Sequence, residues 1–231
     1  PAVQSLPLDK VAEIGEEVID EHGDTILQYG SSKGFLPLRT KLANWYEDEG
    51  TTPDQILLGN GSLQILDMIA KLYLNSDDSV LVEWPSYDRA ITIFERAGAE
   101  VHGVKLEKDG PNLNQLEDLL KTQNPCLFYT IPDFQNPTGI CASRAKRKAV
   151  AELGEKYGTI IVEDAPYRRL RYRGDEKPTI RSFNPEKVIQ MSSLSKLIGP
   201  GIRVGWLVAG VEIVEELARY AEDTYITPSL L

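Results

Sequence analysis

Short apolar segments alternate with stretches of helical periodicity over most of the chain. From Gln55 onward we find seven apolar segments that are rich in β-branched residues, a composition typical of strands. They cover residues 56–59, 79–83, 100–104, 126–130, 159–163, 187–193 and 203–210. Between them, apolar residues recur at helical spacing, as Ile65, Leu66 and Ile69 do. This alternation predicts an α/β domain in which helices cover both faces of a mostly parallel sheet.

The last two apolar segments depart from that pattern. Only residues 194–202 separate them, which is too short for the crossover helix that a parallel pair needs. We therefore expect the final strand to run antiparallel to its neighbour, which gives a mixed sheet of seven strands. Residues 8–22, 34–49 and 143–157 are helical in pattern. The chain thus divides into an N-terminal helical segment, 1–54, and a sheet domain, 55–231.

Composition and charge narrow the class of protein. The 231 residues, 42% hydrophobic and 26% charged, suffice for one globular domain with its own core. A net charge of −10 argues against a nucleic-acid partner, because binding a phosphate backbone needs a basic patch. The single basic cluster, 144–148, lies on a predicted helix, where we expect a solvated face.

Cysteine content and hydropathy indicate where the protein resides. Two cysteines, Cys126 and Cys141, cannot form a disulfide framework, and we expect both to be reduced. Residues 1–10 lack the pattern of a signal peptide, and no apolar run is long enough to span a membrane. We therefore expect a cytoplasmic protein that has no membrane partner.

The connection after the segment 187–193 carries the first candidate chemistry. A lysine at a strand end is most often a surface residue, but the neighbours of Lys196 change that interpretation. Ser193 and Ser195 supply hydroxyl groups, and Arg203 follows seven residues after the lysine. Hydroxyls and a guanidinium suit a phosphate. A lysine beside that phosphate is well placed to condense with an aldehyde.

Two further strand ends carry matching groups. The glycine-rich turn 59–62 leads from a strand into a helix, where backbone N–H groups can converge on a phosphate, although such turns are common. Asp164 and Tyr167 follow the strand 159–163, and an aspartate there is most often a helix cap. Pyridoxal 5′-phosphate (PLP) needs a carboxylate that keeps its ring nitrogen protonated, and a phenol near O3′ helps. Asp164 and Tyr167 fit those two roles.

Two loops remain ambiguous when each is considered alone. The sequence FQNPTG, 134–139, is ordinary turn chemistry. Tyr87 follows another strand and offers an aromatic face, although a single aromatic residue more often belongs to a core or a surface.

Taken together, these motifs resemble those of the fold type I, class I/II aminotransferases. The similarity is greatest to the branch of 2-aminoadipate, aromatic and kynurenine aminotransferases, and it runs from about Tyr29 to the end of the chain. It implies the three-layer α/β/α large domain of PLP-dependent transferases. It also implies that Lys196 forms the internal aldimine with PLP, while Ser193 and Arg203 bind the cofactor phosphate.

The resemblance assigns the other motifs as well. Asp164 pairs with the pyridine nitrogen and Tyr167 with O3′, while Asn136 hydrogen-bonds O3′ and approaches the substrate carboxylate. Tyr87 matches the aromatic residue that stacks on the ring. The phosphate-cup turn corresponds to Gly61, Ser62 and Leu63. Because the family often has a polar side chain at the position of Leu63, only the backbone amide can serve there.

Three further expectations come from the same resemblance. Tyr29 matches a tyrosine that reaches the phosphate of a neighbouring subunit, which implies a homodimer with shared active sites. The bonds Trp84–Pro85 and Asn136–Pro137 match cis peptides of the family. Family members run to roughly 400 residues and end in a small domain, so we expect this chain to be a fragment that lacks that domain.

The implied reaction is the transfer of an amino group between an amino acid and a 2-oxo acid, with Lys196 as the general acid/base and Asp164 and Tyr167 supporting it. Three alternatives remain open. The same cofactor site also suits a lyase, a decarboxylase or a cyclase. The chain also suits the aminotransferase-like effector domain of a transcriptional regulator. The third is an α/β binding protein without PLP.

Overall fold

A single eight-stranded sheet forms the centre of the computed structural model, which describes residue 4 and residues 6–230. Its strand order is β1-β8-β7-β6-β5-β2-β3-β4. The strands are β1 (Ile56–Gly59), β2 (Ser79–Trp84), β3 (Glu100–Glu107), β4 (Gly110–Pro111), β5 (Leu127–Thr130), β6 (Ile160–Asp164), β7 (Val188–Ser193) and β8 (Gly205–Val208). All seven predicted strands are present. The additional strand, β4, pairs only two residues with the end of β3.

Strand direction brings most strand ends to one edge of the sheet. β7, β6, β5, β2 and β3 are mutually parallel, and β8 runs antiparallel to β7, as its short connection predicts. β1 is antiparallel to β8 and therefore parallel to the rest. Consequently the carboxyl ends of these six parallel strands and the amino end of β8 share an edge. In open α/β sheets this edge is where ligands bind.

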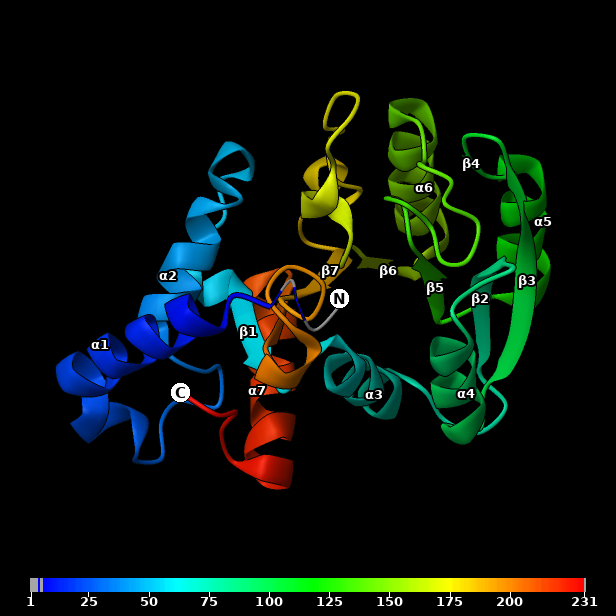
Figure 1. The fold of residues 1–231 in the computed structure, drawn as a ribbon. Helices are drawn as coiled ribbons and strands as arrows, with labels where there is room; N and C mark the ends of the chain where they lie inside the picture. Colours follow the sequence, from blue (N-terminus) through cyan, green and yellow to red (C-terminus); the bar gives the residue numbers. More distant parts are fainter. Residues whose placement is uncertain (1–3, 5, 231) are drawn as a thin grey trace.

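Helices cover both faces of the sheet, which gives the three layers expected (Figure 1). α3, α4 and α7 pack on one face, while α5 and α6 pack on the other. The helices are α1 (Leu8–Ile26), α2 (Leu36–Asn44), α3 (Ser62–Tyr73), α4 (Asp88–Arg96), α5 (Leu113–Gln123), α6 (Arg144–Tyr157) and α7 (Val211–Tyr225). The predicted helix 34–49 is α2 followed by the short 3₁₀ helix η2 (Glu47–Glu49).

Alternation along the strands decides which side chains reach which face. In β5, Leu127 and Tyr129 pack toward α3 and α4, whereas Phe128 packs toward α5 and α6. In β6, Val162 belongs to the first cluster. Because strand side chains alternate with a period of two, Asp164 lies on the same face as Val162. The strands are buried on both faces, which explains their nearly continuous apolar sequence.

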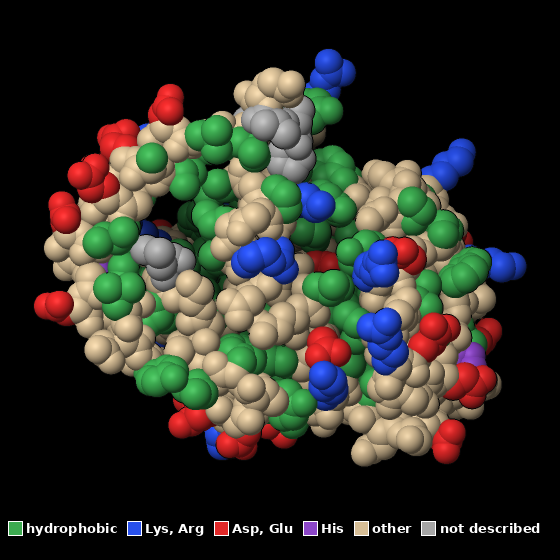
Figure 2. Space-filling model, turned by 60° about the horizontal axis from the view of Figure 1, so that its bottom comes forward, with side chains coloured by type: hydrophobic (Ala, Val, Ile, Leu, Met, Phe, Trp, Pro, Cys, Tyr) green, Lys and Arg blue, Asp and Glu red, His purple; other side chains and the backbone are tan. Residues whose placement is uncertain are grey.

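α1 lies at the side of the sheet domain and has little cover within the described chain. Ile26 is its only buried residue among those described, while Leu8 and Ile19 are 65% and 48% exposed. Acidic side chains follow the outer rim at the left of Figure 2, where α1 lies, and hydrophobic ones face inward. Among the described residues, no helix is long and apolar enough to cross a membrane.

Candidate active site

The predicted site residues converge on one pocket at the carboxyl edge of the sheet. The pocket has a volume of about 260 Å³ and is formed by segments that follow β1, β2, β5, β6 and β7. Its lining consists of Ser62, Leu63, Tyr87, Ile131, Asn136, Asp164, Pro166, Tyr167, Ser193, Ser195, Lys196, Pro200 and Arg203. Of the predicted residues, only Gly61 and Tyr29 are not part of this lining.

Asp164, the last residue of β6, is a buried carboxyl group with one unsatisfied oxygen. Its side chain lies on the same face of the sheet as that of Tyr129, whose hydroxyl donates to Oδ2 at 2.6 Å. Oδ1 is buried and has no hydrogen-bond partner among the described residues. Burial raises the pKa of Asp164 to about 6, although the Tyr129 hydrogen bond opposes that rise. Oδ1 is therefore available to accept a hydrogen bond from a group that enters the pocket.

Tyr167, Asn136 and Tyr87 bring three polar or aromatic side chains to the same pocket. Asn136 and Tyr167 both line the pocket, and Asn136 lies near enough to the Tyr167 hydroxyl to influence its pKa. Burial, together with the charge of Asp164, raises the pKa of Tyr167, while Asn136 opposes this. The peptide bonds Trp84–Pro85 and Asn136–Pro137 are both cis, as predicted.

The turn between β1 and α3 forms a cradle beside Arg203. Gly61 has a φ of +99°, and a Cβ at this position would lie 2.2 Å from Arg203 Nη2. That nitrogen donates to Asn60 O at 2.8 Å, which fixes the guanidinium against the turn. On the other side, a Cβ on Gly205 would lie 2.4 Å from Ser62 N. Only glycines allow the turn, the guanidinium and β8 to approach this closely.

This cradle has the properties of an anion site. α3 begins at Ser62, and the first N–H groups of a helix have no acceptor within the helix. Leu63 can contribute only its backbone amide. Ser193 Oγ is buried at the end of β7, where it accepts from Ser195 N at 3.0 Å. Ser193 Oγ also lies 2.8 Å from Ser195 Oγ, so Ser195 takes part in the same site.

Lys196 lies in the connection between β7 and β8, next to this anion site. Its side chain is exposed and lines the pocket. Within residues 4 and 6–230, no hydrogen bond or ion pair engages its amine. Tyr29, in contrast, is 79% exposed and lies at a separate depression formed with residues 227–230.

Some contributors to the site were not predicted from the sequence. Tyr129 and Gly205 lie within the predicted strands 126–130 and 203–210, and nothing in the local sequence distinguishes them from other strand residues. The expectation of a solvated basic face over 144–148 is wrong at Arg147. Its side chain is fully buried because it pairs with the equally buried Asp133 at 2.9 Å. Both cysteines are free, as expected.

The sheet, its helical layers and this pocket define the class of protein: a PLP-transferase fold with a lysine and a buried carboxylate at its carboxyl edge. The chain belongs to the aminotransferase class I and II family, whose model matches residues 2–231.

Three relatives illustrate this membership. The aromatic-amino-acid aminotransferase 1 of Thermococcus litoralis is 36% identical in an alignment 234 residues long, which covers 96% of this chain and 56% of the relative. The solved α-aminoadipate aminotransferase LysN of Thermus thermophilus, in complex with N-(5′-phosphopyridoxyl)-L-leucine, has a TM-score of 0.92 and 33% identity; the match covers all of this chain and 59% of LysN. The uncharacterized HTH-type transcriptional regulator YisV of Bacillus subtilis is 29% identical, over 95% of this chain and 46% of the regulator. The chain thus spans less than two thirds of these relatives.

Proposed function

We propose that this chain is the PLP-binding part of an aminotransferase that moves an amino group between an amino acid and a 2-oxo acid. The observation that carries the proposal is the pocket that Lys196 and Asp164 share. It combines an anion cradle with an amine and a buried carboxylate oxygen that have no partner among the residues the structure describes. These are the three kinds of group that PLP requires.

The residues present fit PLP in each of its parts. The unpartnered Oδ1 of Asp164 would accept a hydrogen bond from a protonated ring nitrogen. The glycine cradle beside Arg203, with Ser62 and Ser193, would hold the phosphate. Asn136 and Tyr167 would donate to O3′, and Tyr87 would face the ring.

The chain's own residues then divide the work of the reaction. When bound, PLP supplies an aldehyde carbon that condenses with amines and a ring that accepts the electron pair left at the substrate Cα. Lys196 would hold the cofactor through its Nζ. Once the substrate amine has displaced it, Lys196 would move the proton away from Cα as a general base. Asp164 would keep the ring nitrogen protonated.

We further propose that Tyr29 serves the active site of a second copy of this chain. Its side chain is largely exposed and lies outside the pocket of its own chain. The exposed apolar side chains of α1 favour the same arrangement, because a partner would cover them. Sedimentation of the protein with and without Tyr29→Ala, combined with a PLP titration, separates a dimer contact from a cofactor contact.

One incubation distinguishes the aminotransferase from its rivals. The protein is mixed with PLP and single amino acids in the absence of a 2-oxo acid. An aminotransferase releases one equivalent of 2-oxo acid and accumulates pyridoxamine phosphate, whereas a lyase releases ammonia continuously. A ligand-sensing domain, which the similarity to YisV keeps as a second candidate, would bind without forming either product. Lys196→Ala is the control, and 2-oxo acid release by this variant would contradict the assignment.

A further inference from the structure

A fully buried carboxylate lies near the start of the loop that carries Asn136 and faces three arginines. Asp133 is 0% exposed. Its Oδ1 accepts from Arg147 Nη2 and from Arg171 Nη2, both at 2.9 Å. Its Oδ2 accepts from Arg147 Nη1 at 3.0 Å and from Arg168 Nη1 at 3.3 Å. None of these four residues lines the pocket, so the site described above does not explain the cluster.

Arg147 clamps both ends of the segment that carries Asn136. Besides the two bonds to Asp133, its Nη2 donates to Pro132 O at 2.9 Å and its Nε donates to Ala142 O at 3.1 Å. The segment is closed a second time, because Ala142 N donates to Pro132 O at 2.8 Å. Arg147 and Asp133 therefore fix where this loop leaves β5 and where it leads into α6.

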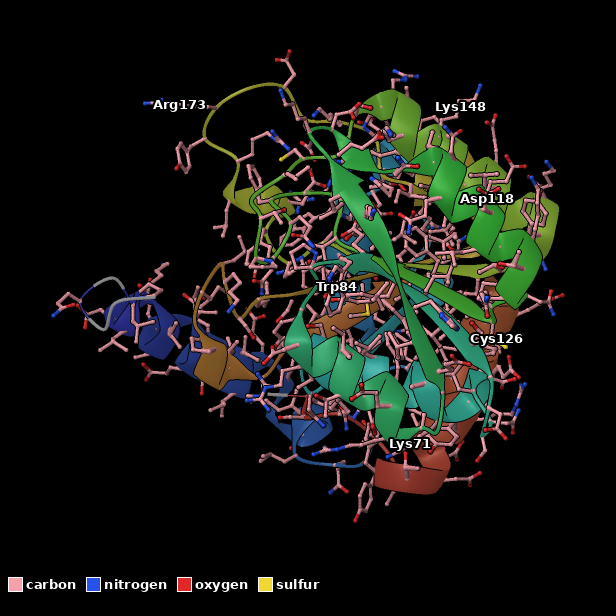
Figure 3. The ribbon with its side chains drawn as sticks, turned by 90° about the vertical axis from the view of Figure 1, so that its right-hand side faces the viewer. Lys71, Trp84, Asp118, Cys126, Lys148 and Arg173 are labelled. Atoms are coloured by element: carbon pink, nitrogen blue, oxygen red, sulfur yellow. The ribbon has the colours of Figure 1, made fainter. Side chains whose placement is uncertain are left out.

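Arg168 and Arg171 bring the second loop to the same carboxylate. They follow Tyr167 by one and four residues, and Arg171 also lies over the ring of Phe134, 4.7 Å from its centroid. Arg173, farther along this loop, points away from the body of the protein (Figure 3). Asp133 thus ties the loop of Tyr167 to the loop of Asn136.

The charges around Asp133 indicate that this residue does more than occupy space in the core. Burial alone would raise the pKa of Asp133, but the hydrogen bonds of Arg147 and the charges of all three arginines lower it below its ordinary value. One carboxylate faces three guanidiniums, and within the described part of the chain only Arg168 has a second acidic partner, Glu176 at 2.9 Å. Apolar side chains would fill such a space at lower cost in folding energy, whereas a bidentate ion pair fixes direction and distance.

We propose that Asp133 is a positioning residue, which through Arg147 on one side and Arg168 and Arg171 on the other holds Asn136 and Tyr167 at a fixed spacing in the pocket. This inference rests on the proposed function only in naming what the two side chains are positioned for, namely O3′ of PLP. Groups that serve a reacting centre need support of this kind, because a displacement of about 0.5 Å already costs function.

The first test uses hydrogen exchange of the cofactor-free protein, which needs no PLP. In Asp133→Asn we expect amides of both loops to exchange roughly 10- to 100-fold faster, the factor set by losing a hydrogen bond to a charged group. The reporters are Gln135 N, which donates to Ile140 O, and Leu170 N, which donates to Tyr167 O. Faster exchange in one loop alone, or in neither, would overturn the proposal.

The second test follows the visible absorption of the PLP complex against pH. Donors to O3′ favour its anionic form, so misplacing Asn136 and Tyr167 should raise the midpoint of the spectral change by roughly 0.5–1 pH unit. An unchanged midpoint in Asp133→Asn would overturn the proposal. If the wild type forms no PLP complex, the proposed function fails, while hydrogen exchange still decides the positioning role.

Two further variants separate positioning from stability. Glu49→Gln breaks another ion pair, to the buried Arg181 at 3.1 Å, and neither of these residues lines the pocket or contacts Asp133. It should lower the stability yet leave the spectral midpoint and the exchange of both loops unchanged. Should Asp133→Asn fail to fold, Arg171→Gln removes one of the two ion pairs that join the loop of Tyr167 to Asp133, and leaves those of Arg168 and Arg147 in place. Smaller changes of the same sign are then expected, and their absence would overturn the proposal.

Discussion

Two carboxyl groups at the end of β6 are buried on opposite faces of the sheet. Asp164 faces the pocket and is 5% exposed, whereas Glu163 faces away from it and is 0% exposed. Burial raises the pKa of Asp164 from 3.8 to about 6, and it raises that of Glu163 from 4.5 to about 7. In the cofactor-free protein, both groups are therefore costly to ionise.

The sign of the effect on stability follows from these raised values. The folded state binds the Asp164 proton more tightly than the unfolded chain does. Its contribution to stability is therefore fully present below about pH 4 and is lost as the pH rises through about 6. At 1.36 kcal/mol per pKa unit, the complete loss amounts to about 3 kcal/mol.

Asp164→Asn removes the charge while keeping the shape and an acceptor for the Tyr129 hydroxyl. We expect the free energy of unfolding of this variant, relative to wild type, to increase by about 2 kcal/mol between pH 4 and pH 8. Glu163→Gln is the matched control, because it removes an equally buried charge from the face away from the pocket. We expect a gain of about 3 kcal/mol there, since the pKa of Glu163 is raised further from its ordinary value.

Denaturant unfolding of the cofactor-free proteins over this pH range measures both gains, and a PLP titration of each variant completes the comparison. Only Asp164→Asn should bind PLP more weakly. A difference in unfolding free energy that does not change with pH would refute the raised pKa of Asp164. Equal loss of PLP affinity in both variants would refute the role of Asp164 in facing the cofactor.

Two more substitutions test the surroundings of the pocket. Gly205→Ala places a Cβ 2.4 Å from Ser62 N, a backbone atom that cannot move aside as a flexible side chain can. We expect the free energy of unfolding, measured with denaturant, to fall by about 1–3 kcal/mol and PLP to bind more weakly. In the control Gly201→Ala, the new Cβ meets nothing within 4 Å, and stability should change by about 0.5 kcal/mol or less. Equal effects of the two substitutions would contradict the close packing of β8 against the turn after β1. Tyr129→Phe removes the hydrogen-bond donor to Asp164 and should raise the pKa of Asp164 by about one to two units. In the same pH series, the stability contributed by protonated Asp164 should then be lost at a higher pH. An unchanged pH of this loss would contradict the hydrogen bond.

The strands could be predicted because their signal is local. Each is a short apolar run, and the short connection between β7 and β8 was enough to indicate antiparallel pairing. β4 could not be predicted, since its two residues have no pattern of their own and depend on β3. α4 and α7 were not predicted either. In α4, only Ala90, Ile93 and Phe94 are buried, whereas the spacing of Val214, Leu217 and Ala218 in α7 was a usable signal.

The pocket residues could be anticipated because motifs at the ends of parallel strands must meet at one edge. Contributors whose role depends on a distant partner could not. Arg147 belongs to a basic run, and its burial depends on Asp133, which lies 14 residues earlier in a loop. The importance of Gly205 depends on how closely the turn after β1 approaches β8. Sequence patterns describe faces of elements, and these contacts form between elements.

Covalent attachment of PLP at Lys196 tests the central claim most directly. The protein is incubated with PLP, reduced with borohydride and digested, and the modified peptide is located by mass spectrometry. The account predicts one PLP equivalent on Lys196, a visible absorption band that disappears on reduction, and neither of these in Lys196→Ala. Lys187→Ala, at the opposite end of β7, should behave as the wild type does. Absence of the band in folded wild-type protein at saturating PLP, or attachment at another lysine, would contradict the account.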